Sequence, residues 1–351
     1  MASSSCTGWT GPPDYPTVLR SRSGGRGSTV DSDRNKVVFA QGASAAVIRR
    51  LSVRLVLCLV AAVGTGGAVG CDGPTGGPHT SGSASAETSA ETPAPGDHSL
   101  TLAFGANTYK YLLHAPPGYG PGKRLPLVIA LHFYPGTGKE VRETIGIDGR
   151  ADQANFLVAY PDGVDGGFNA LVCCGTTDDV GFLRTLVAHL VQVWSADPDR
   201  VYLTGISNGG DMSLRAAVEA SGVFAAIGVV SAGFGGPRVE PADYAPKSPV
   251  SLITFIGAAD QYFDIFRTGL DTWRQRLHCS RTTSGPLPAG ARGTYERARC
   301  ADGSDVDAYV IELMGHVWPG ANSGRLAGSD IPVPATELIW AFFEAHPRLP
   351  R

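Results

Sequence analysis

Short continuous apolar runs recur along the chain after residue 120. They occupy Leu127–Leu131, Phe156–Tyr160, Val201–Thr204, Ala226–Val230 and Val250–Ile256. Apolar runs without polar alternation are typical of strands that are buried on both faces of a sheet. Two alternating segments before them, 100–104 and 109–114, predict an antiparallel hairpin, and residues 309–313 predict one more strand.

Helical periodicity separates these runs. Apolar residues recur at helical spacing over 179–195, and further helices are predicted over 208–220 and 336–345. Because strands alternate with helices, we predict an α/β protein with a mostly parallel, doubly wound sheet and short antiparallel additions at its edge. Residues 99–351 are expected to form this single domain.

The residues before this domain have a different character. Residues 1–46 show no apolar period, and we interpret them as a leader that results from an overextended start codon. Residues 47–71 place three arginines before a short apolar run and then small residues, which is the order of a secretory signal peptide. Residues 72–98, rich in Gly, Ser, Thr, Ala and Pro, predict a disordered linker.

The predicted signal peptide ends at Ala68-Val69-Gly70-Cys71. This segment resembles a bacterial lipobox, in which Cys71 would be the lipidated first residue of the mature protein. Ala68 stands where that pattern usually has Leu, Val or Ile, so cleavage without lipidation remains an alternative. Both routes predict an extracellular or cell-surface protein, and only a lipid anchor at Cys71 would attach it to a membrane.

Charge and composition exclude several classes of protein. The chain has 29 Lys+Arg against 32 Asp+Glu, a net charge of -3, and 43% hydrophobic residues. A net charge near zero does not favour binding to the negatively charged backbone of nucleic acid. The apolar fraction argues against a chain that is disordered throughout. Because no Cys or His pair has the C-x-x-C or H-x-x-x-H spacing of zinc ligands, we expect no metal and no cofactor.

Four cysteines fall in the predicted domain: Cys173, Cys174, Cys279 and Cys300. An even number in an exported domain suggests disulfides, and four cysteines allow three pairings. A bridge between Cys173 and Cys174 would need an unusual eight-membered ring. We therefore expect a disulfide between Cys279 and Cys300 only.

The sharpest chemical signal is the segment VYLTGISNGG at 201–210, in which a buried strand leads into G-x-S-x-G and then into a helix. This is the context of a nucleophile elbow. Ser207 must occupy a strained turn, so Gly205 and Gly209 are needed where a Cβ would clash. The backbone N–H of Asn208, at the start of the helix, is the expected first donor of an oxyanion hole.

A serine nucleophile needs a base and an orienting acid, in the chain order Ser, Asp or Glu, His. Asp260 follows the run that ends at Ile256 and is the expected acid, with Asp264 as its competitor. His132 and His316 are the histidines that follow central strands. His132 belongs to the loop expected to supply the second oxyanion donor, so His316 is the expected base.

The domain resembles the secreted poly(3-hydroxybutyrate) depolymerase and feruloyl esterase family of α/β-hydrolases over residues 108–346. The resemblance rests on PLVIALH, YPDG, CCG, DDVGFLRTLV, GISNGG, GAAD, GHVWPG and ATELIWAFF, which occur in this order. It implies the α/β-hydrolase fold, ester hydrolysis through an acyl-enzyme, and a triad of Ser207, Asp260 and His316.

One segment departs from the family. After the strand at 127–131, members usually have His-Gly, a small residue or cysteine, and further glycines, whereas this chain has His132-Phe133-Tyr134-Pro135-Gly136. The backbone N–H of Tyr134 is the expected second oxyanion donor. Phe133 would either misalign that donor or narrow the acyl pocket, and both possibilities remain open.

The leading hypothesis is a serine esterase that acts on short or aromatic acyl esters of small molecules, polysaccharides or polyesters. Because the predicted domain at 99–351 is not followed by a linker or polymer-binding module in this sequence, we expect a short-chain or soluble substrate before a solid polyester. A surface-binding lipoprotein with weak catalysis and a serine peptidase on the same fold are the alternatives.

Overall fold

The parallel part of the sheet forms where the apolar runs predict it. The computed structural model describes residues 92–120, 122–287 and 290–348. The predicted leader, the signal peptide, Cys71 and the linker up to residue 91 lie outside the described residues. Among the residues that are described, no helix has both the length and the apolar character required to cross a membrane.

Within this part of the chain, a ten-stranded sheet has the order β1-β2-β4-β3-β5-β6-β7-β10-β9-β8. Its six central strands, from β4 to β10, pair in parallel, while β1, β2, β9 and β8 add antiparallel strands at the two ends. This arrangement confirms the predicted sheet. The strands are β1 (Gly96–Phe104), β2 (Asn107–Ala115), β3 (Leu125–Leu131), β4 (Leu157–Pro161), β5 (Ala196–Ile206), β6 (Ala226–Val230), β7 (Ser251–Gly257), β8 (Ser280–Pro286), β9 (Gly293–Arg299) and β10 (Asp305–Ile311).

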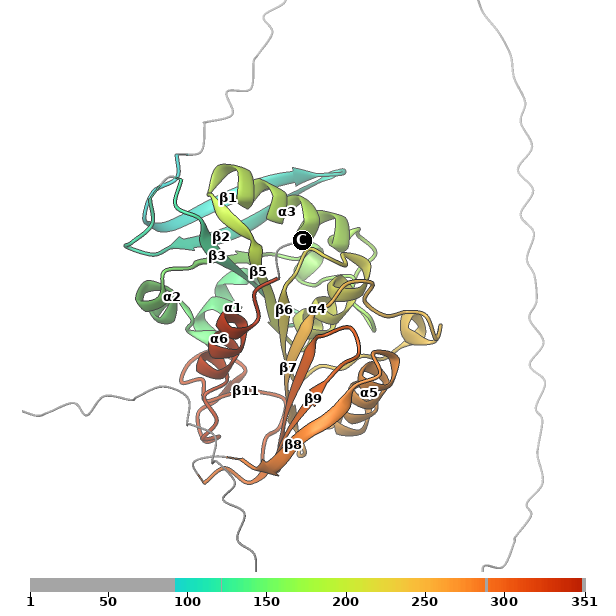
Figure 1. The fold of residues 1–351 in the computed structure, drawn as a ribbon. Helices are drawn as coiled ribbons and strands as arrows, with labels where there is room; N and C mark the ends of the chain where they lie inside the picture. Colours follow the sequence, from blue (N-terminus) through green and yellow to red (C-terminus); the bar gives the residue numbers. More distant parts are fainter. Residues whose placement is uncertain (1–91, 121, 288–289, 349–351) are drawn as a thin grey trace, which may run out of the picture. The chain divides into compact units, whose positions relative to one another are not determined.

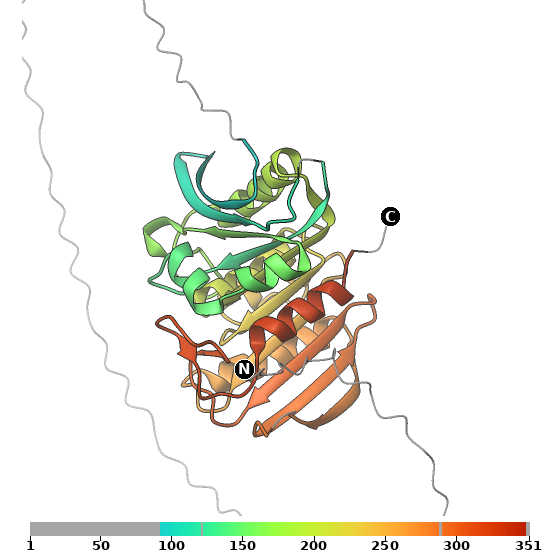
Figure 2. The same cartoon turned by 90° about the vertical axis from the view of Figure 1, so that its left-hand side faces the viewer.

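Helices cover both faces of the sheet, and a separate apolar core lies under each set (Figures 1 and 2). One face carries α3 (Asp179–Val193), α4 (Asn208–Glu219) and α5 (Phe263–Arg276). The other carries α1 (Gly138–Ile145), α2 (Asp148–Ala154) and α6 (Ala335–Ala345). The loops add two short 3₁₀ turns, Val164–Gly166 and Pro237–Val239, and a small ladder of β11 (Trp318–Pro319) with β12 (Ala327–Gly328).

Strand β1 begins at Gly96, so the last three residues of the predicted disordered linker, 96–98, are part of the sheet. Two side chains explain why. The Asp97 carboxylate accepts hydrogen bonds from His114 and Arg142, and the His98 ring meets the ring of Trp194 edge-on with centroids 4.7 Å apart. These contacts to residues distant in sequence order a segment whose composition predicts disorder.

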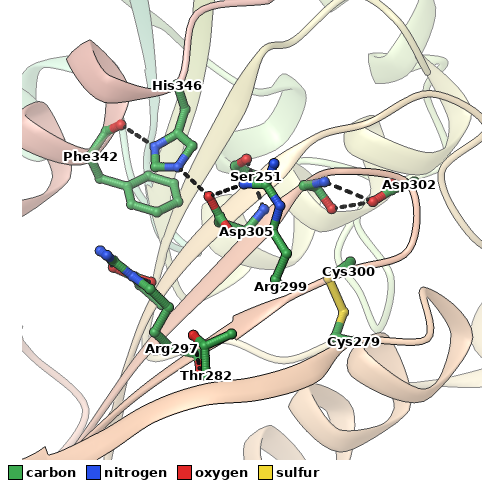
Figure 3. A network of polar contacts seen from close by, with 12 residues as sticks. Ser251, Cys279, Thr282, Arg297, Arg299, Cys300, Asp302, Asp305, Phe342 and His346 are labelled. Carbon is green, nitrogen blue, oxygen red and sulfur yellow. Dashed lines mark hydrogen bonds and ion pairs between the residues drawn. A yellow bond between two sulfur atoms is a disulfide. The ribbon is translucent and has the colours of Figure 1, made fainter.

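The hairpin of β8 and β9 has no signal in the sequence, because β8 is polar and almost wholly exposed and so shows no apolar alternation. The expected disulfide lies at its base: Cys279 precedes β8, Cys300 follows β9, and their sulfur atoms are 1.98 Å apart. Figure 3 shows the disulfide beside the polar contacts of Asp305, which accepts hydrogen bonds from Arg299 and His346. The disulfide therefore joins the hairpin to the end of α5.

A second disulfide joins Cys173 and Cys174, so the expectation of a single bridge is wrong. Backbone hydrogen bonds hold the two cysteines in a tight loop: Cys174 N–H donates to the Phe168 carbonyl, and Ala170 N–H donates to the Cys173 carbonyl. Contacts of this kind have no signature in cysteine spacing.

Candidate active site

Ser207 occupies a sharp turn between β5 and α4. Its φ of 57° and ψ of -124° lie in a region that non-glycine residues rarely adopt. A Cβ at Gly205 would overlap the Gly209 backbone, and a Cβ at Gly209 would overlap the Leu131 carbonyl oxygen. The two glycines therefore allow β5, α4 and the end of β3 to approach closely around Ser207.

His316 and Asp260 form a hydrogen-bonded pair. His316 follows β10 and Asp260 follows β7, and His316 Nδ1 lies 2.7 Å from Asp260 Oδ2. The Asp260 side chain is fully buried, and its other oxygen accepts a hydrogen bond from the Tyr262 N–H at 3.0 Å. Since a carboxylate only accepts, the proton of a neutral His316 lies on Nδ1, and Nε2 remains as the basic nitrogen. The competitor Asp264 is exposed in the first turn of α5.

The sheet brings these residues to one edge, because β5, β6, β7 and β10 are parallel neighbours whose carboxyl ends coincide. Two further contacts connect the serine turn to the histidine loop. Ser207 N–H donates to the Val230 carbonyl, and Ser231 Oγ, on the next residue, donates to the carbonyl of Val317. These contacts link the turn at Ser207, through the end of β6, to the residue that follows His316.

His132 has a different environment from His316. It is completely buried; Nδ1 donates to the Phe133 carbonyl at 2.7 Å, and Nε2 accepts from the Gly163 N–H at 2.9 Å. Burial lowers the pKa of His132, which keeps the ring neutral. With both nitrogens engaged in backbone contacts, His132 supports the loop after β3 and is not available as a base.

That loop and the start of α4 carry the expected oxyanion donors. Asn208 is the first residue of α4, so its backbone N–H has no acceptor within the helix. Gly209 packs against the Leu131 and His132 carbonyls, which places the start of α4 beside the loop that contains Tyr134. Phe133 is buried in the core, with the Arg325 guanidinium 4.4 Å from its ring centroid, whereas Tyr134 is 50% exposed. The Phe133 ring therefore belongs to the core, and Tyr134 is the ring at the surface.

The Asn208 side chain holds a second loop, within the segment 165–177 that the sequence suggests as a wall of the pocket. Its Oδ1 accepts from the Phe168 N–H at 2.9 Å, and its Nδ2 donates to the Phe168 and Cys173 carbonyls at 3.0 and 3.2 Å. The residue after the predicted nucleophile thus fixes the loop that contains the Cys173–Cys174 disulfide. The adjacency of Asn208 to Ser207 in G-x-S-x-G was the only available signal for this contact.

Asp211 is a further residue that sequence reasoning missed. Its backbone N–H donates to the Ser207 carbonyl at 2.9 Å, and its Oδ1 accepts from the Gly233 N–H at 3.0 Å. Burial raises the pKa of Asp211 to about 7, while the Gly233 hydrogen bond and the charge of nearby His316 oppose that rise. A second carboxyl group therefore lies in the catalytic centre, one helical turn after Ser207.

Apolar side chains border this edge of the sheet. Among the described residues, the exposed large hydrophobic side chains all lie on segments that follow the carboxyl ends of β3, β4, β7 or β10: Tyr134, Val172, Tyr262, Ile265 and Leu313. The Tyr262 ring stands edge-on to His316, with centroids 5.7 Å apart. We call these five residues the apolar rim.

Away from the active site, two carboxylates and a histidine are close enough to bind a metal ion: the ligand atoms of Asp97, His114 and Asp148 lie within 4.8 Å of one another. Arg142 already supplies the positive charge there, with ion pairs of 2.6 Å to both Asp97 and Asp148. The cluster is therefore an ion-pair network that joins β1 and β2 to the helices α1 and α2.

Comparison with known proteins agrees with this geometry. Residues 109–239 match the family described as Esterase PHB depolymerase. The protein named "Putative esterase NocK" of Nocardia uniformis subsp. tsuyamanensis is 30% identical over 62% of this chain and 73% of its own length. Feruloyl esterase C of Emericella nidulans is 26% identical over 70% of this chain and 88% of its own.

A solved structure with the same fold is the acetyl xylan esterase from Aspergillus awamori, with a TM-score of 0.51, 17% identity, and coverage of 70% of this chain and 99% of that one. The turn at Ser207, the His316–Asp260 pair and these similarities lead to one assignment. The chain belongs to the Esterase PHB depolymerase family and is a carboxylic ester hydrolase with the α/β-hydrolase fold.

Proposed function

We propose that this protein hydrolyses esters through a catalytic triad of Ser207, His316 and Asp260. The observation that carries the proposal is the buried hydrogen bond from His316 to Asp260, at the same sheet edge as the strained turn of Ser207. Asp260 holds the ring so that Nε2 remains the basic nitrogen. His316 then acts as general base toward the Ser207 hydroxyl.

The reaction has two halves. Ser207 Oγ attacks the ester carbonyl carbon, its proton passes to His316 Nε2, and that proton is returned to the departing alcohol as the C–O bond breaks. Water then attacks the acyl-enzyme, again loses its proton to His316, and releases the acid and the free serine. Asp260 stays ionised and stabilises the protonated imidazole.

The carbonyl oxygen, negative in each tetrahedral intermediate, needs donors that are already in place. We assign this role to the backbone N–H groups of Asn208 and Tyr134. The Asn208 side chain, hydrogen-bonded to Phe168 and Cys173, fixes the first donor. The buried Phe133 ring anchors the loop that carries the second. Loss of one such donor costs about 100-fold or more in turnover.

The substrates are expected to be short-chain or aromatic acyl esters, either small or attached to a polysaccharide or polyester. The apolar rim supports this class, because Tyr262 offers apolar surface beside His316, and Tyr134 and Val172 are exposed on the segments that follow β3 and β4 at the same edge of the sheet. One similar sequence is named a feruloyl esterase, after an aromatic acyl group, and one similar structure is named an acetyl xylan esterase, after a short acyl group.

The proposal also includes export. The signal peptide at 47–71, with Cys71 as a lipid attachment site, would place the hydrolase domain on the cell surface at the end of the linker. The disulfide of Cys279 and Cys300 fits an oxidising compartment.

Two measurements test the triad. A fluorophosphonate probe should label the wild type and Ser323→Ala, a control at an exposed serine, but not Ser207→Ala. Hydrolysis of p-nitrophenyl acetate, methyl ferulate and a hydroxybutyrate oligomer should disappear with Ser207, and a matched p-nitroanilide should remain intact. Labelling that persists in Ser207→Ala, or equal rates for wild type and variant, would refute the proposal.

A further inference from the structure

The carboxyl group of Asp211 has no task in the mechanism above. Asp260 already orients His316, so the triad does not need a second acid. Yet Asp211 is close to both the nucleophile and the base: its backbone N–H donates to the Ser207 carbonyl in the first turn of α4, and its carboxyl group interacts electrostatically with His316. Helical side chains tilt toward the helix N-terminus, which directs this carboxyl group back toward the serine turn.

The partners of Asp211 leave one oxygen available. Oδ1 accepts from Gly233 N–H, and among the described residues no Lys or Arg forms an ion pair with Asp211. The side chain is half-buried, and no polar atom of it is sealed from solvent without a partner. Oδ2 therefore has no hydrogen-bond partner among the described residues and is not sealed from solvent.

Burial raises the pKa of Asp211 to about 7, which shows that water solvates this group poorly. A poorly solvated acceptor gains more from a hydrogen bond than one that water already satisfies. The Gly233 N–H holds the Asp211 carboxyl group in position. Gly233 is itself packed closely against Phe266, since a Cβ at Gly233 would overlap the Phe266 ring.

We propose that Asp211 is a specificity-determining residue that accepts a hydrogen bond from a hydroxyl group of the substrate near the scissile ester. This inference rests on the triad proposed above and adds a preference to it. A hydroxyl group on the acyl chain and one on the alcohol have the same chemistry, and the experiment below separates them.

The experiment compares kcat/KM for paired esters. p-Nitrophenyl 3-hydroxybutyrate against p-nitrophenyl butyrate probes the acyl side, and glyceryl monobutyrate against propyl butyrate probes the alcohol side. In the wild type, we expect the hydroxylated member of one pair to be preferred. Asp211→Asn, which keeps an oxygen for Gly233, should reduce that preference, and Asp211→Ala should reduce it by about tenfold or more.

Both kcat/KM values of a pair are measured on the same protein sample, so a misfolded fraction lowers both equally and leaves their ratio unchanged. Asp271→Asn, at an exposed position of α5, should retain the wild-type ratio. The inference is overturned if the wild type prefers neither hydroxylated ester or if both Asp211 variants keep the wild-type ratio. It is also overturned if the variants lose the same factor on both members of each pair, since Asp211 would then act through His316.

Failure of the proposed triad has a separate signature. A wild type that hydrolyses none of the four esters and does not react with a fluorophosphonate at Ser207 contradicts the esterase mechanism. A wild type that hydrolyses all four with unchanged ratios in the variants contradicts only the role of Asp211.

Discussion

The raised pKa of Asp211 has a consequence for stability that is independent of any substrate. Burial raises this pKa from 3.8 to about 7 in the folded protein. Between these values the unfolded chain has lost the proton and the folded protein has kept it, so stability falls as pH rises toward 7. The contribution is fully present below pH 3.8 and is lost once the folded carboxyl group ionises.

The magnitude follows from the two pKa values. Between pH 5 and pH 8, Asp211 alone lowers the free energy of unfolding of the wild type by about 2.5 kcal/mol. An asparagine side chain does not titrate, so Asp211→Asn removes this pH dependence. We therefore expect the variant to gain about 2.5 kcal/mol relative to the wild type when the pH is raised from 5 to 8.

The assay is urea unfolding of both proteins at pH 5 and pH 8, followed by tryptophan fluorescence. Titrating groups that do not interact with Asp211 are common to both proteins and cancel in the difference. Asp271→Asn is the matched control, because this aspartate is exposed on α5 and its replacement should not change the difference. A difference between Asp211→Asn and wild type that is constant within about 0.5 kcal/mol at the two pH values would refute the reasoning.

Three further outcomes are expected. Asp260→Asn should lower kcat by about 10⁴-fold because His316 loses the partner that sets its tautomer, whereas Asp264→Asn should retain activity; ester hydrolysis measures both. Replacing Cys279 and Cys300 by alanine should cost about 3 kcal/mol and lower Tm by about 6–12 °C, because the disulfide spans 21 residues of chain; calorimetry under oxidising conditions measures it, and an unchanged Tm contradicts the estimate. Burial lowers the pKa of His114, but its hydrogen bonds to the carboxylates of Asp97 and Asp152 raise it overall from 6.5, so this stabilisation is present below about pH 6.5 and is lost above the folded pKa. His114→Asn should therefore be more destabilising at about pH 5.5 than at about pH 8.5 in urea unfolding, and the reverse order would contradict the sign.

The parts of the fold that could be predicted are those with a local pattern. The central strands are buried on both faces, so their sequences are continuous apolar runs, and each lies within a few residues of its predicted position. The helices over 179–193 and 208–219 have one buried face and repeat at helical spacing. The exposed strand β8 and the short helix α2 lack such a pattern and were missed. Helix α1 was missed because it is short, although it buries Val141 and Ile145 at helical spacing.

The candidate site divides in the same way. Ser207, Asp260 and His316 stand directly after strands or in a glycine-defined turn, so chain order and strand ends were enough to select them. Asp211 and the Asn208 side chain depend on contacts with Gly233 and Phe168, which lie far away in sequence. Only the folded chain brings these groups together, and residue types at fixed spacing do not encode them.

The segment after β3 shows why a departure from a family pattern needs the structure for its interpretation. A phenylalanine in place of glycine suggests either a distorted donor or a filled pocket. In the structure the Phe133 ring is turned into the core beneath the Arg325 guanidinium, and its backbone carbonyl accepts from His132. The bulky side chain thus occupies core volume, while its main chain is fixed by a buried histidine. Glycine would leave this loop more freedom, so Phe133 and His132 together restrict the position of the following residue, Tyr134. The departure is therefore consistent with a preorganised donor, because the packing of Phe133 and the His132 hydrogen bond make this loop rigid.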